Sequence, residues 1–128
     1  MQLLLKDDLP FVTVTVEYKG KAVDIPNVLV DTGSASTILA ADSLIGVGIE
    51  PAADDTLHTI RGVGGIEVVY LRKVDSLKVG KVGVAGFEIE VGGMDYGFEI
   101  SGILGMDFLR SVGAIINLSE MRLDFVKE

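Results

Sequence analysis

The strongest constraint on the fold is a series of short segments in which apolar and polar residues alternate, with glycines between them. Alternation with a period of two indicates a β-strand with one face buried and the other exposed to solvent. The first such segment, residues 12–18, carries four apolar residues on one face: Val12, Val14, Val16 and Tyr18. Gly20 supplies a turn, and residues 21–30 follow as a second strand in which we expect Pro26 at a bulge or an edge.

Composition favours the same fold class. Hydrophobic residues make up 48% of the chain but aromatic residues only 6%, so we expect an aliphatic core built from strands. The 16 glycines are dispersed, as turns between short strands require. Residues 107–112 are the most convincing helix, because Asp107 can act near its N-cap and Gly113 can end it. The sequence therefore predicts one all-β domain spanning residues 1–128, with one short helix near its C-terminus.

The net charge of −8 and the short apolar runs argue against two classes of function, nucleic-acid binding and action at a membrane. An acidic surface repels phosphate groups, so binding to nucleic acid is not expected. No apolar run approaches the length of a membrane span, and the apolar residues 1–5 are too few for a signal peptide. We therefore expect a soluble protein, with a cytoplasmic location favoured, that does not act at a membrane.

An apolar strand runs directly into the tetrapeptide Asp31-Thr32-Gly33-Ser34. By itself such a tetrapeptide is most often an Asx-turn or a helix N-cap. It also resembles the phosphate loop of actin-like ATPases, but that fold needs two large α/β lobes, which a β-rich chain of 128 residues cannot build. A second apolar element that ends in glycine, Ile103-Leu104-Gly105, follows much later in the chain.

A carboxylate on a tight turn can activate water when a second carboxylate lies beside it. One group acts as a general base on the water while the other, protonated, donates its proton to the carbonyl oxygen of an amide. Two carboxylates in contact share one proton, because like charges at close range cannot both ionise. This chain has one aspartate in such a setting, Asp31, so a two-fold axis between two copies would have to supply the second. We expect Thr32 to make contacts across that axis, Gly33 to donate its N–H to the carboxylate, and Ser34 Oγ to hydrogen-bond its outer oxygen.

Three motifs, in this order, resemble those of the retropepsin-like aspartic proteases, the single-domain dimeric relatives of pepsin. They are residues 28–34 with Ser36-Thr37-Ile38, the glycine-rich residues 62–65, and Ile103-Leu104-Gly105 before a helix. The resemblance covers residues 10–125 and is closer to cellular and prokaryotic members than to viral ones. It implies a closed β-barrel or sandwich that needs neither metal nor cofactor.

The resemblance also implies a role for each motif. Asp31 of each subunit would form the catalytic pair of a homodimeric aspartic endopeptidase, supported by residues 32–34. Residues 56–71 would be a flap that closes over an extended peptide or protein substrate. Five flap residues would contact the substrate: Gly62, Val63, Gly64, Gly65 and Ile66. Four apolar residues would line or support the subsites: Leu29, Ile38, Ile103 and Leu104.

An alternative is a catalytically silent, dimeric peptide-binding or assembly module on the same scaffold. Viral members carry an arginine after their Ile-x-Gly element and an acidic residue shortly after Asp-Thr-Gly, where this chain has Met106 and Ala35-Ser36. The ionic brace of the viral dimer is therefore missing, which keeps the alternative open. We expect residues 121–125 at the dimer interface, a solvated or packing role for His58, and solvated loop positions for Asp54-Asp55.

Overall fold

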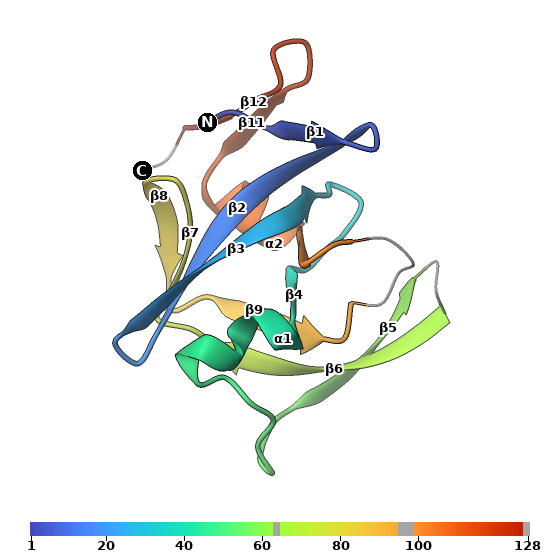
Figure 1. The fold of residues 1–128 in the computed structure, drawn as a ribbon, viewed down its shortest axis with the longest axis vertical. Helices are drawn as coiled ribbons and strands as arrows, with labels where there is room; N and C mark the ends of the chain where they lie inside the picture. The colour runs from blue at the N-terminus through green and yellow to red at the C-terminus, as the bar shows by residue number, and fades with distance from the viewer. Residues whose placement is uncertain (63–64, 95–98, 127–128) are drawn as a thin grey trace.

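Strands formed by the alternating segments make up most of the molecule (Figure 1). The computed structural model describes residues 1–62, 65–94 and 99–126. Its strands are β1 (Leu4–Lys6), β2 (Leu9–Tyr18), β3 (Lys21–Val30), β4 (Ile38–Ala40), β5 (Leu57–Gly62), β6 (Gly65–Lys73), β7 (Ser76–Val79), β8 (Val82–Ala85), β9 (Glu88–Gly92), β10 (Gly102–Leu104), β11 (Ala114–Asn117) and β12 (Arg122–Phe125). Its helical elements are α1 (Ala41–Leu44), the 3₁₀ turn η1 (Ile45–Val47) and α2 (Met106–Ser111). The predicted all-β class, with a short helix near the C-terminus, is confirmed.

One sheet contains 10 of the described strands, in the order β5-β6-β9-β4-β10-β3-β2-β7-β8, with β1 paired to β2. Strands β11 and β12 form a separate two-stranded sheet. The expectation of a closed barrel is wrong for the strands that the structure describes, because the path starts at β5 and ends at β8 without joining them. In Figure 1 the β5–β6 hairpin and β8 lie on opposite sides of the molecule, so the two edges that closure would join do not meet.

Strand β10 lies between β3 and β4, although it is remote from both in sequence. It pairs in parallel with β3, which places Leu104 beside Val30. It pairs antiparallel with β4, which places Ile103 beside Ile38. The chain therefore leaves β3, passes through residues 31–37 and returns as β4 on the other side of β10. Residues 31–37, called the Asp31 loop below, are thus held at both ends by the same strand.

Local irregularities in the strands follow the sequence. Val12 pairs with Val28 and Val14 pairs with Ile25, so two residues of β3 lie opposite one residue of β2. This is the bulge predicted at Pro26, and the next residue, Asn27, adopts a positive φ of 59°.

Helix α2 begins at Met106, close to the predicted start at residue 107. Gly105 occupies the N-cap position, and Asp107 lies near it in the first turn, as predicted, where its Oδ1 accepts the N–H of Phe108 at 2.7 Å. The Asp107 carboxylate also accepts hydrogen bonds from Thr37. The helix ends as predicted, because Gly113 adopts a φ of 61°, a left-handed conformation that favours glycine.

Two apolar clusters form the core. The larger contains mainly aliphatic side chains and the α2 residue Phe108, whose ring meets Phe87 edge-on with 5.8 Å between centroids. The smaller contains Phe11, Ile38, Ala40, Val69, Met94 and Ile100, with Leu29, Ile60 and Ile103 packed against it. Through Ile60 and Val69 this smaller cluster joins the β5–β6 hairpin to the strands that flank the Asp31 loop. Within the described residues, no helix has the length and apolarity needed to cross a bilayer.

Candidate active site

Asp31 lies at the point where β3 ends beside β10. Its backbone N–H donates to the carbonyl oxygen of Leu104 at 3.0 Å, which continues the parallel pairing by one residue. The N–H of Ser34 donates to the Asp31 carbonyl at 3.2 Å and closes a tight turn. The N–H of Gly33 donates to Asp31 Oδ1 at 2.9 Å, as expected from the sequence. The turn therefore orients the carboxylate through a backbone donor, and the side chain stays partly exposed.

The two hydroxyl residues of the motif differ in their surroundings. Ser34 Oγ donates to the carbonyl of Ser36 at 2.7 Å, so the expected bond from this hydroxyl to the Asp31 carboxylate is not what the structure shows. Thr32, the residue after Asp31, is exposed. Ser34 thus braces the Asp31 loop from within, and Thr32 is accessible to a second molecule.

Gly105 lets the start of α2 pack directly on the Asp31 loop. Met106 N–H donates to the Ser34 carbonyl at 2.8 Å, and Asp107 N–H donates to the Ala35 carbonyl at 3.2 Å. A Cβ on Gly105 would lie 2.1 Å from the Ser36 carbonyl oxygen, which only glycine avoids. The apolar-apolar-glycine element therefore serves as the platform on which the Asp31 loop rests.

A buried polar pair, Thr37 and Asp107, fastens the loop to α2. Thr37 is fully buried, and its Oγ1 donates to Asp107 Oδ1 at 2.7 Å while its N–H donates to Oδ2 at 3.2 Å. The same Oγ1 accepts the N–H of Gly105 at 3.0 Å. Sequence reasoning missed this pair. The available signal was a threonine placed between the Asp31 motif and an apolar strand, with an aspartate two positions after the glycine of the second motif.

The four residues predicted at the subsites occupy two environments. Leu29, Ile38 and Ile103 are neighbours in register across β3, β10 and β4 and belong to, or pack against, the smaller apolar cluster. Leu29 and Ile103 are partly exposed, which suits residues that line a binding surface. Leu104 is fully buried in the larger core cluster, so it can only support the site from beneath.

The predicted flap is a β-hairpin. Strands β5 and β6 pair from Leu57 opposite Tyr70 to Gly62 opposite Gly65. Val63 and Gly64 lie outside the described residues, as do the side-chain environments of residues 61–65. Ile66 is 65% exposed and, because side chains alternate along a strand, lies on the face opposite buried Val69.

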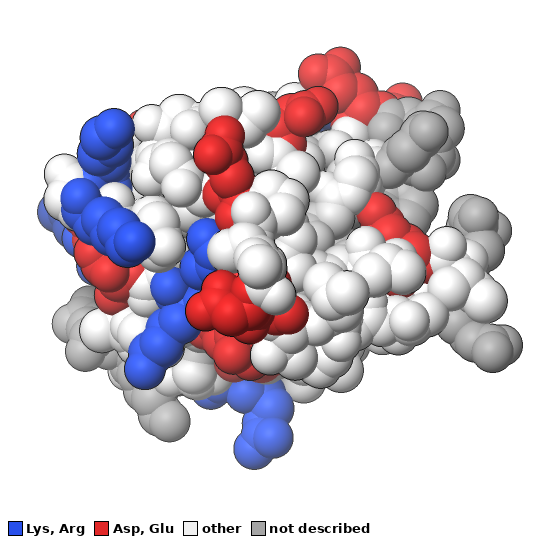
Figure 2. Space-filling view, turned by 90° about the horizontal axis from the view of Figure 1, so that it is seen from below, with Lys and Arg blue, Asp and Glu red and all other residues white. Residues whose placement is uncertain are grey.

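Charged residues are unevenly placed around the hairpin. Figure 2 views the molecule from the side on which β5 and β6 lie, and shows acidic and basic groups gathered on part of this face beside a wide uncharged area. Three exposed apolar side chains come from the hairpin: Leu57, Ile66 and Val68. The other face of the hairpin carries Glu67, whose Oε2 accepts the N–H groups of Gly93 at 2.7 Å and Met94 at 3.3 Å.

The hairpin is also fastened at its base by an ion pair. Arg72 donates to both carboxylate oxygens of Asp55, at 2.8 and 3.0 Å, and to the Glu50 carbonyl. These Arg72 hydrogen bonds, followed by the N–H of Ala52, lower the pKa of Asp55 below its ordinary value. Burial raises the pKa of Tyr70, over whose ring the Arg72 guanidinium lies at 5.4 Å. The expectation that Asp55 is simply solvated is therefore wrong.

A family described as aspartyl protease matches residues 12–108. The chain belongs to the aspartyl protease family. The match includes the Asp31 loop, the β5–β6 hairpin and the Ile103-Leu104-Gly105 element, so the three motifs of the retropepsin-like resemblance all lie inside it. A comparison with curated proteins found none that matches the chain.

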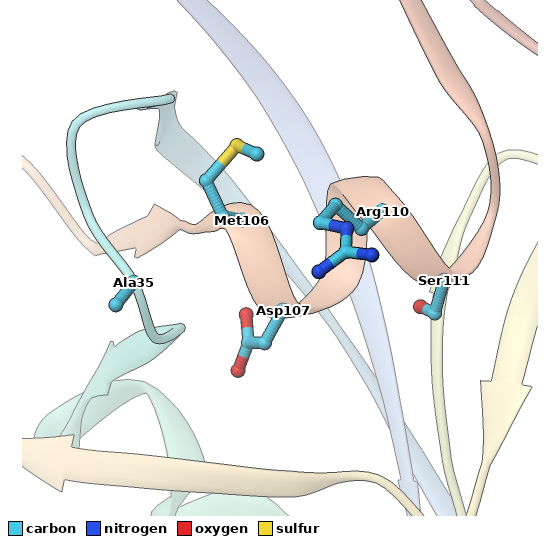
Figure 3. Close-up of a pocket in the computed structure, with 5 residues that line it drawn as sticks. All are labelled: Ala35, Met106, Asp107, Arg110 and Ser111. Carbon is cyan, nitrogen blue, oxygen red and sulfur yellow. The ribbon is translucent and has the colours of Figure 1, made fainter.

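A shallow hollow of about 540 Å³ lies where the Asp31 loop meets α2 (Figure 3). Its lining comes from the loop and from α2: Ala35, Met106, Asp107, Arg110 and Ser111. In Figure 3, Met106 and Asp107 project from the start of α2 in opposite directions. Among the described residues, no group of three His, Cys, Asp or Glu side chains is arranged to hold a metal ion.

Proposed function

We propose that the chain is a homodimeric aspartic endopeptidase in which Asp31 of each subunit supplies one carboxylate of the catalytic pair. The observation that carries this proposal is the setting of Asp31: a partly exposed carboxylate, held by the Gly33 N–H, on a loop fixed at both ends by β10. The family match supports proteolysis in general terms. The dimer and the endopeptidase activity are the parts that experiments have to establish.

The proposed mechanism follows from two carboxylates that share one proton. The ionised Asp31 removes a proton from a water molecule, whose oxygen attacks the carbonyl carbon of the scissile amide. The protonated Asp31 of the partner subunit donates its proton to the carbonyl oxygen, which gives a neutral tetrahedral intermediate. As the C–N bond breaks, the nitrogen takes a proton from the first carboxyl group and the second regains one from the intermediate. The pair is then back in its starting protonation state.

A second copy of the chain completes the site because one subunit brings one motif aspartate. A two-fold axis next to Asp31 places the exposed Thr32 of each subunit where its hydroxyl can contact the partner's loop. Residues 121–125 stay our prediction for the interface. Strand β12 already pairs with β11 on one edge and with residues 1–3 on the other, so a sheet that continues into the partner would extend from β11.

The proposed substrate is an extended peptide that lies between the β5–β6 hairpin and the Asp31 loop. An extended strand can hydrogen-bond to the backbone of a hairpin, while its alternate side chains enter apolar pockets. Leu29, Ile38 and Ile103 offer an apolar surface for such side chains, supported by Leu104. Residues 62–66 are the proposed contacts on the flap side.

The test compares wild type with Asp31→Asn on a diverse peptide mixture, with products read by mass spectrometry. Asn keeps the shape of the side chain but cannot act as a base, so we expect cleavage to fall at least about a thousandfold. Asp42→Asn, at an exposed position in α1, is the matched control and should keep wild-type activity. Sedimentation of the same samples should show a dimer for all three proteins.

Three results would contradict the proposal. Cleavage by Asp31→Asn at a level near that of wild type would show that Asp31 is not the catalytic carboxylate. A wild-type protein that cleaves while remaining a monomer at every concentration would exclude the shared pair. A stable dimer that binds peptides without cutting them would instead favour the silent binding module.

A further inference from the structure

Glu90, in the middle of β9, is the most deeply buried charged residue in the described part of the chain, at 7% exposure. It lies between two other strands, opposite Ile38 of β4 and Leu71 of β6. Its neighbours in β9, Ile89 and Val91, point to the other face and belong to the larger apolar core. A buried strand position of this kind ordinarily holds an apolar residue, because burying a carboxylate is costly unless it is paired.

The two carboxylate oxygens of Glu90 have partners on two different parts of the molecule. Ser36 Oγ, in the Asp31 loop, donates to Oε1 at 2.5 Å. His58 Nδ1, in β5 of the flap hairpin, lies 3.6 Å from Oε2, an ion pair when the imidazole is protonated. Glu90 therefore lies at the junction between the loop that carries Asp31 and the hairpin that is proposed to cover the substrate.

The connection continues from Ser36 to Asp31 itself. The Ser36 carbonyl accepts the hydroxyl of Ser34, and the Ser34 N–H closes the turn on the Asp31 carbonyl. A displacement of Ser36 would therefore disturb the turn that orients the carboxylate. On the other side, His58 pairs in register with Val69, which packs in the apolar cluster beneath the hairpin.

From this geometry we propose that Glu90 is a positioning residue, which holds the flap hairpin and the Asp31 loop at a fixed separation for the substrate between them. The proposal rests on the proposed function, since it assigns the hairpin and the loop to the two sides of one substrate site. It gives His58 and Ser36 a shared role through Glu90. It also explains why a carboxylate stands at a strand position that apolar packing alone would fill.

The first measurement is hydrogen exchange, which needs no activity. Glu90→Gln retains the shape of the side chain but loses the charge that attracts His58, and Glu90→Leu removes both acceptors. We expect the amides of residues 57–62 and 65–73 to exchange about five- to tenfold faster in Glu90→Leu, together with those of residues 34–37, as the loss of one or two net hydrogen bonds implies. Glu88→Gln is the matched control, an exposed glutamate on the same strand, and should exchange like wild type.

The second measurement separates positioning from general destabilisation. If the hairpin and loop hold the substrate together, KM for an extended peptide should rise several-fold in Glu90→Gln, with a smaller change in kcat per folded dimer. His58→Ala and Ser36→Ala should each raise KM in the wild-type background. Both effects should largely disappear in the Glu90→Leu background, because the residues act through the same carboxylate.

Three outcomes distinguish a positioning role of Glu90 from a purely structural one and from failure of the proposed function. Faster exchange confined to the hairpin and the Asp31 loop, with the change in KM, would support the proposal. Unchanged exchange, or uniformly faster exchange with KM unaltered, would overturn it and leave Glu90 as a structural residue. Absence of cleavage by wild type would refute the proposed function alone, and the exchange experiment would still decide whether Glu90 couples the two segments.

Discussion

Gly105→Ala tests the central claim about the site, that the start of α2 rests on the Asp31 loop with no room for a side chain. The new Cβ would lie 2.1 Å from the Ser36 carbonyl oxygen, 2.6 Å from the Ser36 carbonyl carbon and 2.9 Å from the Ser34 carbonyl oxygen. All three are backbone atoms, so no side chain can rotate away to make space. The loop would have to retreat by roughly 1 Å to restore ordinary contacts.

The magnitude of the effect follows from what that movement disrupts. Overpacking in a tight interior costs about 1–3 kcal/mol. The shift also stretches two hydrogen bonds across the same contact, Gly105 N–H to Thr37 Oγ1 and Met106 N–H to the Ser34 carbonyl. At about 1 kcal/mol each, these bring the expected loss to about 3–5 kcal/mol, a large part of the stability of a small domain.

Urea unfolding of wild type, Gly105→Ala and Gly46→Ala measures this loss directly. Gly46 is the matched control because an added Cβ there would meet no heavy atom within 4 Å, so its unfolding midpoint should stay near that of wild type or rise slightly. Protease activity per folded molecule should also fall in Gly105→Ala, since the displaced loop carries Asp31. An unfolding midpoint for Gly105→Ala within error of wild type would refute the packing argument.

Two further predictions concern the polar pairs that hold the site. Thr37→Val keeps the shape of the side chain but removes the hydroxyl that bonds to Asp107 and Gly105. The free energy of unfolding, measured in urea, should therefore fall by about 2–3 kcal/mol. Thr59→Val, at an exposed position, is the control and should change it little. The lowered pKa of Asp55 predicts a stabilisation that is present above the ordinary value of 3.8 and is lost as the pH falls below it through the folded-state pKa. The difference in Tm between wild type and Arg72→Met should therefore shrink as the pH is lowered from about 6 to about 2; a constant difference would contradict this origin of the shift.

Local features of the fold could be predicted from the order of residues alone. Alternation with a period of two predicted the strand at residues 12–18, the turn at Gly20 predicted the strand that follows at residues 21–30, and Gly113 predicted the end of α2. The Asp31 turn, with its Gly33 donor, could also be read from four consecutive residues. These features depend on backbone conformation and on neighbours a few positions away, so the order of residues carries the information.

Contacts between residues that are distant in sequence could not be predicted and were found in the three-dimensional structure. The insertion of β10 between β3 and β4, the bond from Thr37 to Asp107 and the burial of Glu90 beside Ser36 and His58 all join segments that are remote in sequence. Their partners depend on strand order and register, and a shift of one residue in β9 or β5 would turn Glu90 or His58 to the opposite face. The expected barrel closure failed for the same reason, because no local pattern states whether β5 and β8 become neighbours.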